Sequence, residues 1–261
     1  MHKSNSVERM LSIPRLFTEQ RPVWTVEEVA AELGLPVSST YRYFQSLLRF
    51  EYLDEAPGQG YCLVPAFIEY DRIIRVTDPL AKVAGPVLAG LTDTLAPGST
   101  LLVCQVYRRK VMCIREQTTG NGMAHTSYER GRPMPLYRGA TSKVILAHQA
   151  WRTQKREYEQ NQKEILAAGM GHDWKSFSAG LREVRKRGYC ISRGEVDTGR
   201  QGIAAPIFSA TGHVAHSLSI VTPADRTSAD DEDRLVMAIV TAAARISEKL
   251  SRFDTVKTIK P

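Results

Sequence analysis

Apolar residues recur at helical spacing near the start of the chain. Val7, Met10, Leu11 and Pro14 stand at i, i+3, i+4 and i+7, and Ser6 precedes them as a candidate N-cap. Proline lacks a backbone donor and cannot continue the hydrogen-bond ladder of a helix. We therefore expect Pro14 to kink or shorten this first helix.

A second helix is predicted between Thr25 and Gly34. Thr25 and Glu28 have the spacing of a capping box, in which the hydroxyl caps the Glu28 amide and the carboxylate reaches back. Glycine takes the left-handed conformation at little cost, so Gly34 is a natural end for the helix. One apolar stripe fills the helix between these points: Val26, Val29, Ala30 and Leu33.

A third helix is predicted after a short turn at residues 35–37, with Ser38 or Ser39 as its cap. Its buried face is expected to contain Tyr41, Phe44 and Leu48. Residues 37–50 include no acidic side chain. The opposite face is polar and cationic, and it carries Ser39, Thr40, Arg42, Tyr43 and Arg49.

Two helices joined by a short turn that contains glycine are typical of the helix-turn-helix motif. In this motif the second helix enters the major groove of DNA, and its hydroxyl and guanidinium groups contact base edges and phosphates. Residues 52–54 and 61–63 are short β-prone runs separated by a Pro-Gly turn, which predicts a hairpin. Pro65 then opens a helix over residues 66–76. The order predicts a winged helix-turn-helix.

The remaining chain alternates between helical and strand patterns. A long apolar stripe at helical spacing runs from Leu80 to Leu95 and is stopped by Pro97 and Gly98. This mixture indicates an α+β domain with a central antiparallel sheet. Strands are expected at residues 100–106, 111–115, 203–208 and 213–221, and helices at residues 141–149, 177–187 and 229–250.

Composition adds three constraints. Apolar residues make up 43% and charged residues 24% of the 261, as in an ordinary globular protein, and no run is apolar enough for a membrane span. The net charge is +7, yet residues 1–77 hold eight Lys or Arg and ten Asp or Glu, so the basic excess lies elsewhere. The beginning of the chain lacks the apolar region of a secretory signal, and the four cysteines form no CxxC pair. We therefore expect a cytoplasmic protein with reduced thiols.

No enzyme motif is visible among the histidines and cysteines. HExxH, GxSxG and phosphate-loop patterns are absent, and His213 and His216 stand three apart on a predicted strand, which places them on opposite faces. A thiol–imidazole pair of Cys104 or Cys113 with His125 is the one catalytic alternative, supported by composition alone. We predict no metal site, no cofactor and no enzymatic activity.

Six segments together resemble the IclR family of bacterial regulators, in this order and spacing. The first three are SVERMLSI, TVEEVAAELGLPVSSTYRYFQSLLRFEYL and GYCLVP. The others are PMPLYRGATSKVILA, GYCISRGEVDTGRQGIAAPIF and VAHSLSIVTPADR. The resemblance implies a winged helix-turn-helix domain over residues 1–64, a linker helix over 65–78 and a GAF-like effector domain over 79–261. It also implies homodimers that often pair into dimers of dimers on operator DNA.

The resemblance also implies two sets of site residues. The DNA-reading helix of the family corresponds to residues 38–50. Together with the polar face described above, it predicts the following DNA contacts: Thr25, Ser38, Ser39, Thr40, Arg42, Tyr43 and Arg49. By position in the family, the predicted ligand contacts are Ala140, Thr141, Ser192, Gly202, Ser219 and Val221.

These pocket residues favour a particular kind of effector. Ser192 stands where the family often has an acid, and Val221 stands where a hydroxyl can occur, so the pocket is less polar and favours a larger or aromatic ligand. The backbone amides of Ala140 and Thr141 open a helix and can receive a carboxylate. We expect a ligand-responsive repressor of a catabolic operon for an aromatic or organic-acid compound, although no residue separates repressors from activators. The acidic balance of residues 1–77 leaves one alternative, a non-catalytic interaction or sensor module without DNA binding.

Overall fold

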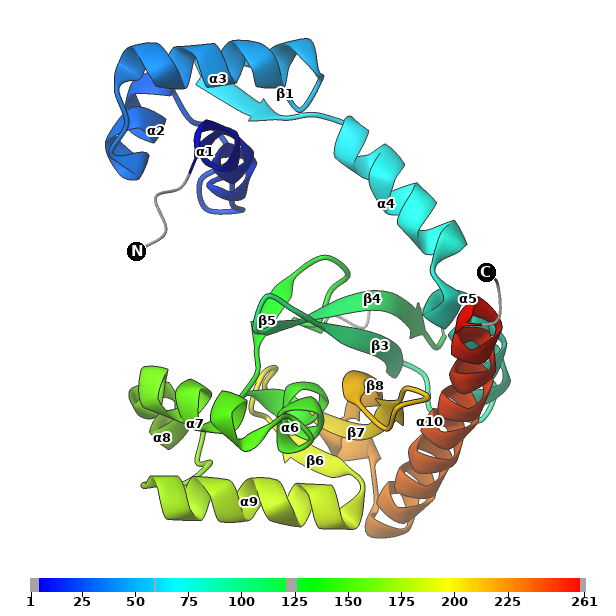
Figure 1. Cartoon of the computed structure of the whole chain (residues 1–261). Helices are drawn as coiled ribbons and strands as arrows, with labels where there is room; N and C mark the ends of the chain where they lie inside the picture. The colour runs from blue at the N-terminus through cyan, green and yellow to red at the C-terminus, as the bar shows by residue number, and fades with distance from the viewer. Residues whose placement is uncertain (1–4, 59, 121–125, 259–261) are drawn as a thin grey trace. The chain divides into compact units, whose positions relative to one another are not determined.

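The computed structural model describes residues 5–58, 60–120 and 126–258 (Figure 1). The chain divides into two compact units, Met1–Val76 and Thr77–Pro261. The first unit is mainly helical and contains one short hairpin, and the second is built around a single antiparallel sheet. The α+β fold predicted from the sequence is confirmed.

The first helix is short, as Pro14 predicted. Helix α1 spans Ser6–Ser12, and a 3-10 turn, η1, follows at Ile13–Arg15 with the proline in its first turn. The cap is Asn5 rather than Ser6, and its side chain accepts a hydrogen bond from the Glu8 amide at 2.9 Å. The predicted apolar stripe is wrong in part, because Val7 and Leu11 are more than half exposed while Ile13 is fully buried.

Helices α2 (Val26–Leu33) and α3 (Val37–Arg49) form the helix-turn-helix. The capping box is confirmed, since the Glu28 amide donates to the Thr25 hydroxyl at 3.2 Å and the Thr25 amide donates to the Glu28 carboxylate at 2.9 Å. Gly34 ends α2 in the left-handed conformation, with φ of 62°. The prediction that Ser38 or Ser39 caps α3 is wrong, because the helix already begins at Val37 and its N-cap, Pro36, makes no side-chain hydrogen bond.

The predicted wing is a two-stranded hairpin. Strands β1 (Leu53–Ala56) and β2 (Gly60–Leu63) pair in antiparallel register, with Leu53 opposite Leu63. Trp24 adds a further bridge, because its amide and carbonyl exchange hydrogen bonds with Tyr61 at 3.1 and 2.8 Å. The hairpin therefore closes over a small core built around Ile13, Val29 and Phe44.

Helix α4 spans Ala66–Thr77 and buries none of its residues. Its first turns are held by the aromatic ring of Tyr52, whose centroid lies 5.8 Å from that of Phe67 and 6.3 Å from that of Tyr70. Figure 1 shows α4 running on from the hairpin as a single extended rod. Beyond these contacts, the apolar side chains of Ile68, Ile74 and Val76 are more than half exposed.

The second unit is organised by a six-stranded antiparallel sheet. The strands lie in the order β5-β4-β3-β8-β7-β6, so the two edges are the short strands β5 and β6. Their bounds are β3 Thr100–Tyr107, β4 Lys110–Thr118, β5 Pro133–Pro135, β6 Cys190–Arg193, β7 Arg200–Phe208 and β8 Val214–Pro223.

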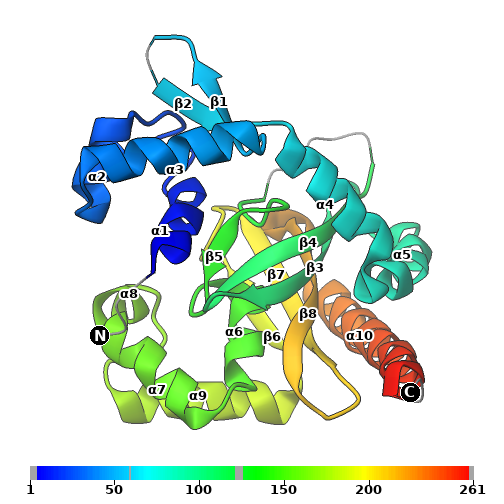
Figure 2. The same ribbon diagram turned by 45° about the horizontal axis from the view of Figure 1, so that its top comes forward.

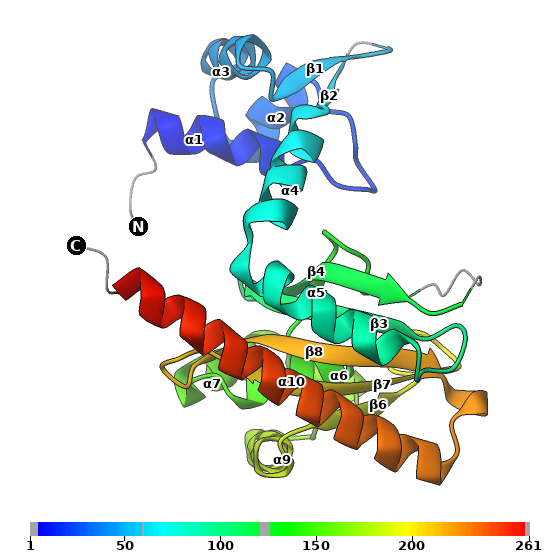
Figure 3. The ribbon, with the colours of Figure 1, turned by 90° about the vertical axis from the view of Figure 1, so that its right-hand side faces the viewer.

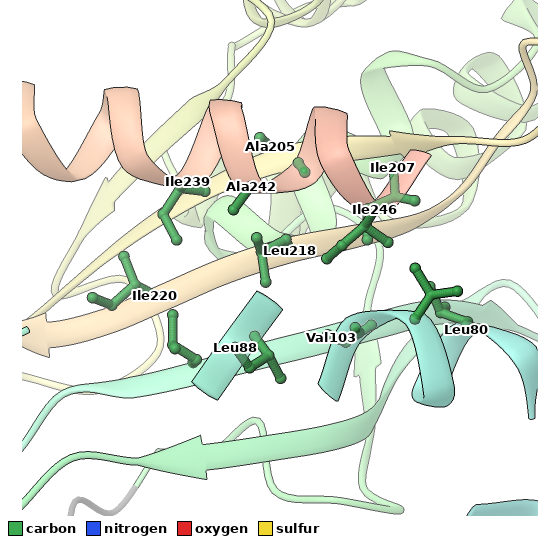
Figure 4. Packing of buried hydrophobic residues seen from close by; sticks show 14 of the residues in the cluster. Leu80, Leu88, Val103, Ala205, Ile207, Leu218, Ile220, Ile239, Ala242 and Ile246 are labelled. Atoms are coloured by element: carbon green, nitrogen blue, oxygen red, sulfur yellow. The ribbon is translucent and has the colours of Figure 1, made fainter. Parts of the chain in front are cut away.

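Helices α5 (Pro79–Thr92) and α10 (Ala229–Thr258) pack on one face of this sheet (Figure 3). Figure 4 shows Ile239, Ala242 and Ile246 of α10 lying over Leu218 and Ile220 of β8. All five side chains are at most 4% exposed. At roughly 25 cal/mol per Å² of buried apolar surface, this layer is a major part of the stability of the unit.

Helix α6 (Gly139–Ala147) covers the opposite face, together with α9 (Trp174–Arg187) (Figure 2). All nine residues of α6 are buried, so the helix lies inside the unit. Two helices that the sequence analysis did not predict, α7 (Trp151–Gln160) and α8 (Gln162–Ala167), connect α6 to α9. A further 3-10 turn, η2 (Ala224–Arg226), precedes α10.

Candidate functional site

The outward face of α3 is polar and cationic. Ser38, Tyr41, Arg42, Gln45 and Arg49 are exposed and stand three to four residues apart, so they form one stripe along the helix. Among the described residues, no carboxylate pairs with either arginine of this stripe. Both guanidinium groups are therefore available to an external anion.

The structure corrects the predicted orientation of α3. Thr40 is fully buried and its hydroxyl donates to the carbonyl of Pro36 at 3.2 Å, so its placement on the exposed face is wrong. Tyr41 was predicted to be buried but is 53% exposed. The physical reason is that Phe44 and Leu47, rather than Phe44 and Leu48, point into the core, which turns the helix by about one residue.

The other predicted DNA contacts lie at different depths around α3. Tyr43 is half-buried and packs against the core of the first unit. Ser39 is half-buried at the first turn, and the Thr25 hydroxyl is engaged in the capping box of α2. Sequence reasoning missed Tyr41 and Gln45, and only the correct rotation of the helix identifies them as outward residues.

A second candidate site lies between α6 and the sheet. A narrow cavity of about 20 Å³ is lined by Ala140, Thr141, Ser192, Gly202 and Val221, five of the six predicted ligand contacts. Such a volume accommodates little more than one water molecule. The sequence-predicted residues are thus brought together, but the space between them is too small for an effector.

Hydroxyl groups join α6 to the strands beneath it. The Ala140 amide donates to the Ser192 hydroxyl at 3.0 Å, and the Thr141 hydroxyl donates to that of Ser219 at 2.9 Å. Ser219 is the sixth predicted residue. It is fully buried behind Thr141 and does not line the cavity. Polar groups at this depth require partners, and these hydrogen bonds supply them.

A carboxylate of the chain itself occupies the beginning of α6. The Gly139 amide donates to Glu195 Oε2 at 3.1 Å, and Lys143 Nζ lies 2.6 Å from Glu195 Oε1. Lys143 is only 9% exposed, so this ion pair neutralises a buried ammonium. Sequence reasoning missed the pair, because its two members are 52 residues apart and neither belongs to a charge pattern.

Two further groups fix the wall of the cavity. Asp197 accepts hydrogen bonds from the hydroxyls of Thr126 and Ser127 at 3.0 and 2.5 Å. The buried Tyr128 hydroxyl donates to the carbonyl of Arg138 at 2.7 Å, and desolvation raises its pKa well above the ordinary value of a tyrosine. The phenol therefore stays protonated at physiological pH.

The alternative catalytic pair receives no support from the described residues. Cys104 and Cys113 are buried, and desolvation raises the pKa of the Cys104 thiol, which disfavours the nucleophilic thiolate. The imidazole partner proposed for either thiol, His125, lies outside the described residues. The described part of the chain holds no group of His, Cys, Asp and Glu side chains able to bind a metal ion. In the same part, no helix is long and apolar enough to cross a membrane.

A helix-turn-helix with an unpaired cationic face, beside a separate unit with a polar cavity, defines the class of DNA-binding regulators with a sensing domain. Two family models match in agreement with this. The IclR helix-turn-helix domain matches residues 6–57, and the C-terminal model for bacterial transcriptional regulators of the IclR type matches residues 75–248. The chain belongs to the IclR family of transcriptional regulators, which are DNA-binding proteins and not enzymes.

Characterised transcriptional regulators align with most of the chain. The Pca regulon regulatory protein of Pseudomonas putida is 24% identical over 92% of this chain and 81% of its own length. KipR of Bacillus subtilis is 25% identical over 95% and 98%, and the repressor YiaJ of Escherichia coli is 27% identical over 83% and 77%.

Solved structures share the fold. An IclR-type regulator from Silicibacter aligns with a TM-score of 0.76 at 18% identity, over 95% of this chain and 96% of that one. An IclR homologue of Microbacterium hydrocarbonoxydans in complex with 4-hydroxybenzoate aligns with a TM-score of 0.69 at 18% identity, over 94% and 99%.

Proposed function

We propose that the chain represses a catabolic operon and is controlled by an aromatic or carboxylate-bearing effector. Residues 1–64 act as the DNA-binding domain, residues 65–78 as the linker helix and residues 79–261 as the effector domain. The observation that carries the proposal is the exposed, unpaired face of α3 combined with a polar cavity at the start of α6. Relatives named as a Pca regulon regulator and as a repressor support the direction of control.

DNA is read by the outward stripe of α3. Arg42 and Gln45 are placed at the middle of the helix, where arginine pairs with guanine and glutamine with adenine in the major groove. Ser38, Ser39 and Thr25 lie near the starts of the two helices and are suited to phosphate contacts. Arg49, near the end of α3, contacts the phosphate backbone of the DNA, while Tyr43 supports the helix from its half-buried position.

The effector binds beneath the start of α6. A carboxylate fits the backbone amides there, because the beginning of a helix attracts anions. Gly202 and Val221 give the otherwise polar cavity an apolar side, which suits an aromatic body. A solved homologue of the same fold is described in complex with 4-hydroxybenzoate, a molecule with both features.

A second copy of the chain pairs along α4. Four large apolar side chains of this helix are between 47% and 69% exposed, namely Ile68, Ile73, Ile74 and Val76. Helices that expose so many apolar side chains are usually covered by a partner. A homodimer places two copies of α3 on the half-sites of a palindromic operator, and a dimer of dimers extends the same arrangement.

The dimer has one arrangement of its DNA-binding domains that fits the operator and another that does not. The effector controls transcription only if it binds these two arrangements with different affinity. A coupling free energy of about 1–3 kcal/mol changes operator affinity by roughly 5–150-fold. Mobility-shift titrations of the full-length protein on its own upstream DNA, with and without 4-hydroxybenzoate and a series of aliphatic and aromatic acids, test the proposal. We expect specific binding that one of these acids weakens by such a factor.

The acidic balance of residues 1–77 favours a second candidate, a sensor module that binds another protein and not DNA. The same titrations at low and high salt separate the two functions. Binding that is specific, and that Arg42→Ala abolishes, excludes the sensor module. The absence of specific binding at every salt concentration would favour it.

A further inference from the structure

One ion pair joins residues that line two different cavities of the second unit. Lys143 lines an open cleft of about 710 Å³ along α9 and β6, while Glu195 lines the narrow cavity of about 20 Å³. The two side chains meet at 2.6 Å and are 11% and 22% exposed. The ion pair thus lies where the small cavity and the cleft come near each other, and the cleft is large enough for a small organic molecule.

Glu195 makes the contacts that an external carboxylate would make. One of its oxygens accepts from the Gly139 amide at the start of α6, and the other accepts from the ammonium of Lys143. Charge-assisted hydrogen bonds of this kind are among the strongest that a carboxylate forms in a protein. An effector carboxylate cannot reach either donor until Glu195 has left.

The segment that carries Glu195 is a short loop between two glycines. Gly194 and Gly199 follow β6 and precede β7, with φ of 64° and 73°, a region that other residues adopt only with strain. The strand pairing is closed off at the base of the loop, because the Gly194 amide donates to the carbonyl of Arg200 at 2.8 Å. The loop backbone is held in place, because the Glu195 carbonyl accepts from Arg138 Nε at 2.7 Å and the Asp197 carboxylate accepts from Thr126 and Ser127. Only the Glu195 side chain therefore needs to rotate for its carboxylate to leave the site.

We propose that a carboxylate effector takes the place of Glu195 on the Gly139 amide and on Lys143 Nζ, and that the Glu195 side chain rotates out of the site. This deepens the proposed function, on which it rests, because it assigns Lys143 as an effector contact and Glu195 as an internal competitor. Lys143 stays paired with a carboxylate before and after the exchange. A neutral ligand would leave a buried ammonium without a partner, so the site selects anions.

Removal of the Glu195 side chain tests the exchange without knowledge of the effector. In Glu195→Ala the place of the carboxylate is empty, and acetate should bind there and raise the thermal unfolding midpoint. An anion at about ten times its Kd stabilises the folded state about tenfold, which for a chain of this size is a rise of about 3 °C. Acetamide at the same concentration should have no such effect, because it has the same shape but no charge.

Matched variants give the controls. Glu183 lines the same cleft and is exposed, so Glu183→Ala should respond to acetate no more than the wild type does. The double variant Lys143→Met, Glu195→Ala should lose the response, because the ammonium is absent. Equal acetate effects in Glu195→Ala and Glu183→Ala would overturn the proposal.

A second variant covers the case in which Glu195→Ala does not fold. Glu195→Gln keeps an acceptor for the Gly139 amide but cannot neutralise Lys143, so it should bind 4-hydroxybenzoate about tenfold more tightly than the wild type and 4-hydroxybenzamide no better. Unchanged or weaker binding of 4-hydroxybenzoate contradicts the exchange.

Operator binding, measured on the same proteins, distinguishes failure of the carboxylate exchange from failure of the proposed regulator function. Specific operator binding without any carboxylate effect would overturn the exchange and leave the regulator in place. Acetate rescue of Glu195→Ala without operator binding by the wild type would instead contradict the DNA-reading part of the proposed function.

Discussion

Two single substitutions on α3, Arg42→Ala and Thr40→Val, separate the contribution of the helix to DNA recognition from its contribution to stability. Arg42 is exposed and has no carboxylate partner among the described residues, so Arg42→Ala should change the free energy of unfolding by less than about 0.5 kcal/mol. Loss of a contact to a base edge should weaken operator binding by about 1–3 kcal/mol, or roughly 5–150-fold.

Thr40→Val should lower the stability of the first unit and leave operator affinity unchanged. The substitution removes the hydrogen bond to the carbonyl of Pro36, but that carbonyl still accepts the amides of Ser39 and Thr40 at 3.0 Å each. The cost in stability should therefore lie at the lower end of the usual range, at about 0.5–1 kcal/mol. Operator affinity should stay within about twofold of the wild type, because the side chain does not reach the surface.

Two measurements on each variant check this pair of expectations. Fluorescence anisotropy on labelled operator DNA gives the affinity at two salt concentrations, and urea unfolding gives the stability. Arg42→Ala should relax specificity if it contacts a base edge, and weaken binding on all sequences equally if it contacts phosphate. The orientation of α3 described above is refuted if Thr40→Val abolishes DNA binding while Arg42→Ala leaves it intact.

Two further substitutions address the second unit. Gly202→Ser places a β-carbon 3.0 Å from the Ser192 hydroxyl and fills the cavity, so calorimetry should find effector binding at least about tenfold weaker, while operator binding persists; undiminished effector binding would place the ligand elsewhere. Glu157 is 3% exposed and binds Arg109, which ties the β3–β4 turn to α7. Since Arg109 is 41% exposed and partly screened, Glu157→Gln should cost only about 1–2 kcal/mol in urea unfolding, and an unchanged midpoint would contradict the importance of this tie.

Local chemistry made several elements predictable from the sequence. The capping box at Thr25 and the left-handed Gly34 fix the two ends of α2 with contacts between near neighbours. Pro14 shortens α1 for a reason that requires no knowledge of tertiary structure. Two strand-like segments at residues 203–208 and 213–221, close together in the chain, likewise predicted the neighbouring strands β7 and β8.

Tertiary structure decided the features that the sequence could not. Two sets of positions on α3 satisfy helical spacing almost equally well, the predicted one with Tyr41 and Leu48 and the observed one with Thr40 and Leu47. Only packing against Ile13 and Val29 selects the second. Helix α7 escaped prediction because its surface is almost wholly polar, with Glu157 as its one buried residue. The predicted pocket residues were brought together, yet neither the narrowness of the cavity nor the Lys143–Glu195 pair has a local signature.

Both faces of the sheet carry an apolar core, but at β8 they differ in chemistry, and this difference assigns them different tasks. On β8, Leu218 and Ile220 face α10 in a dry, closely packed layer, whereas Ser217 and Ser219 face α6 and exchange hydrogen bonds with Thr141. Apolar packing has no second arrangement of similar energy, because any shift opens a void. Hydrogen-bonded hydroxyls and a charge pair can be rearranged when an incoming ligand supplies equivalent partners. Any switch in the second unit therefore belongs on the α6 side, where Glu195 already occupies the place of an anion.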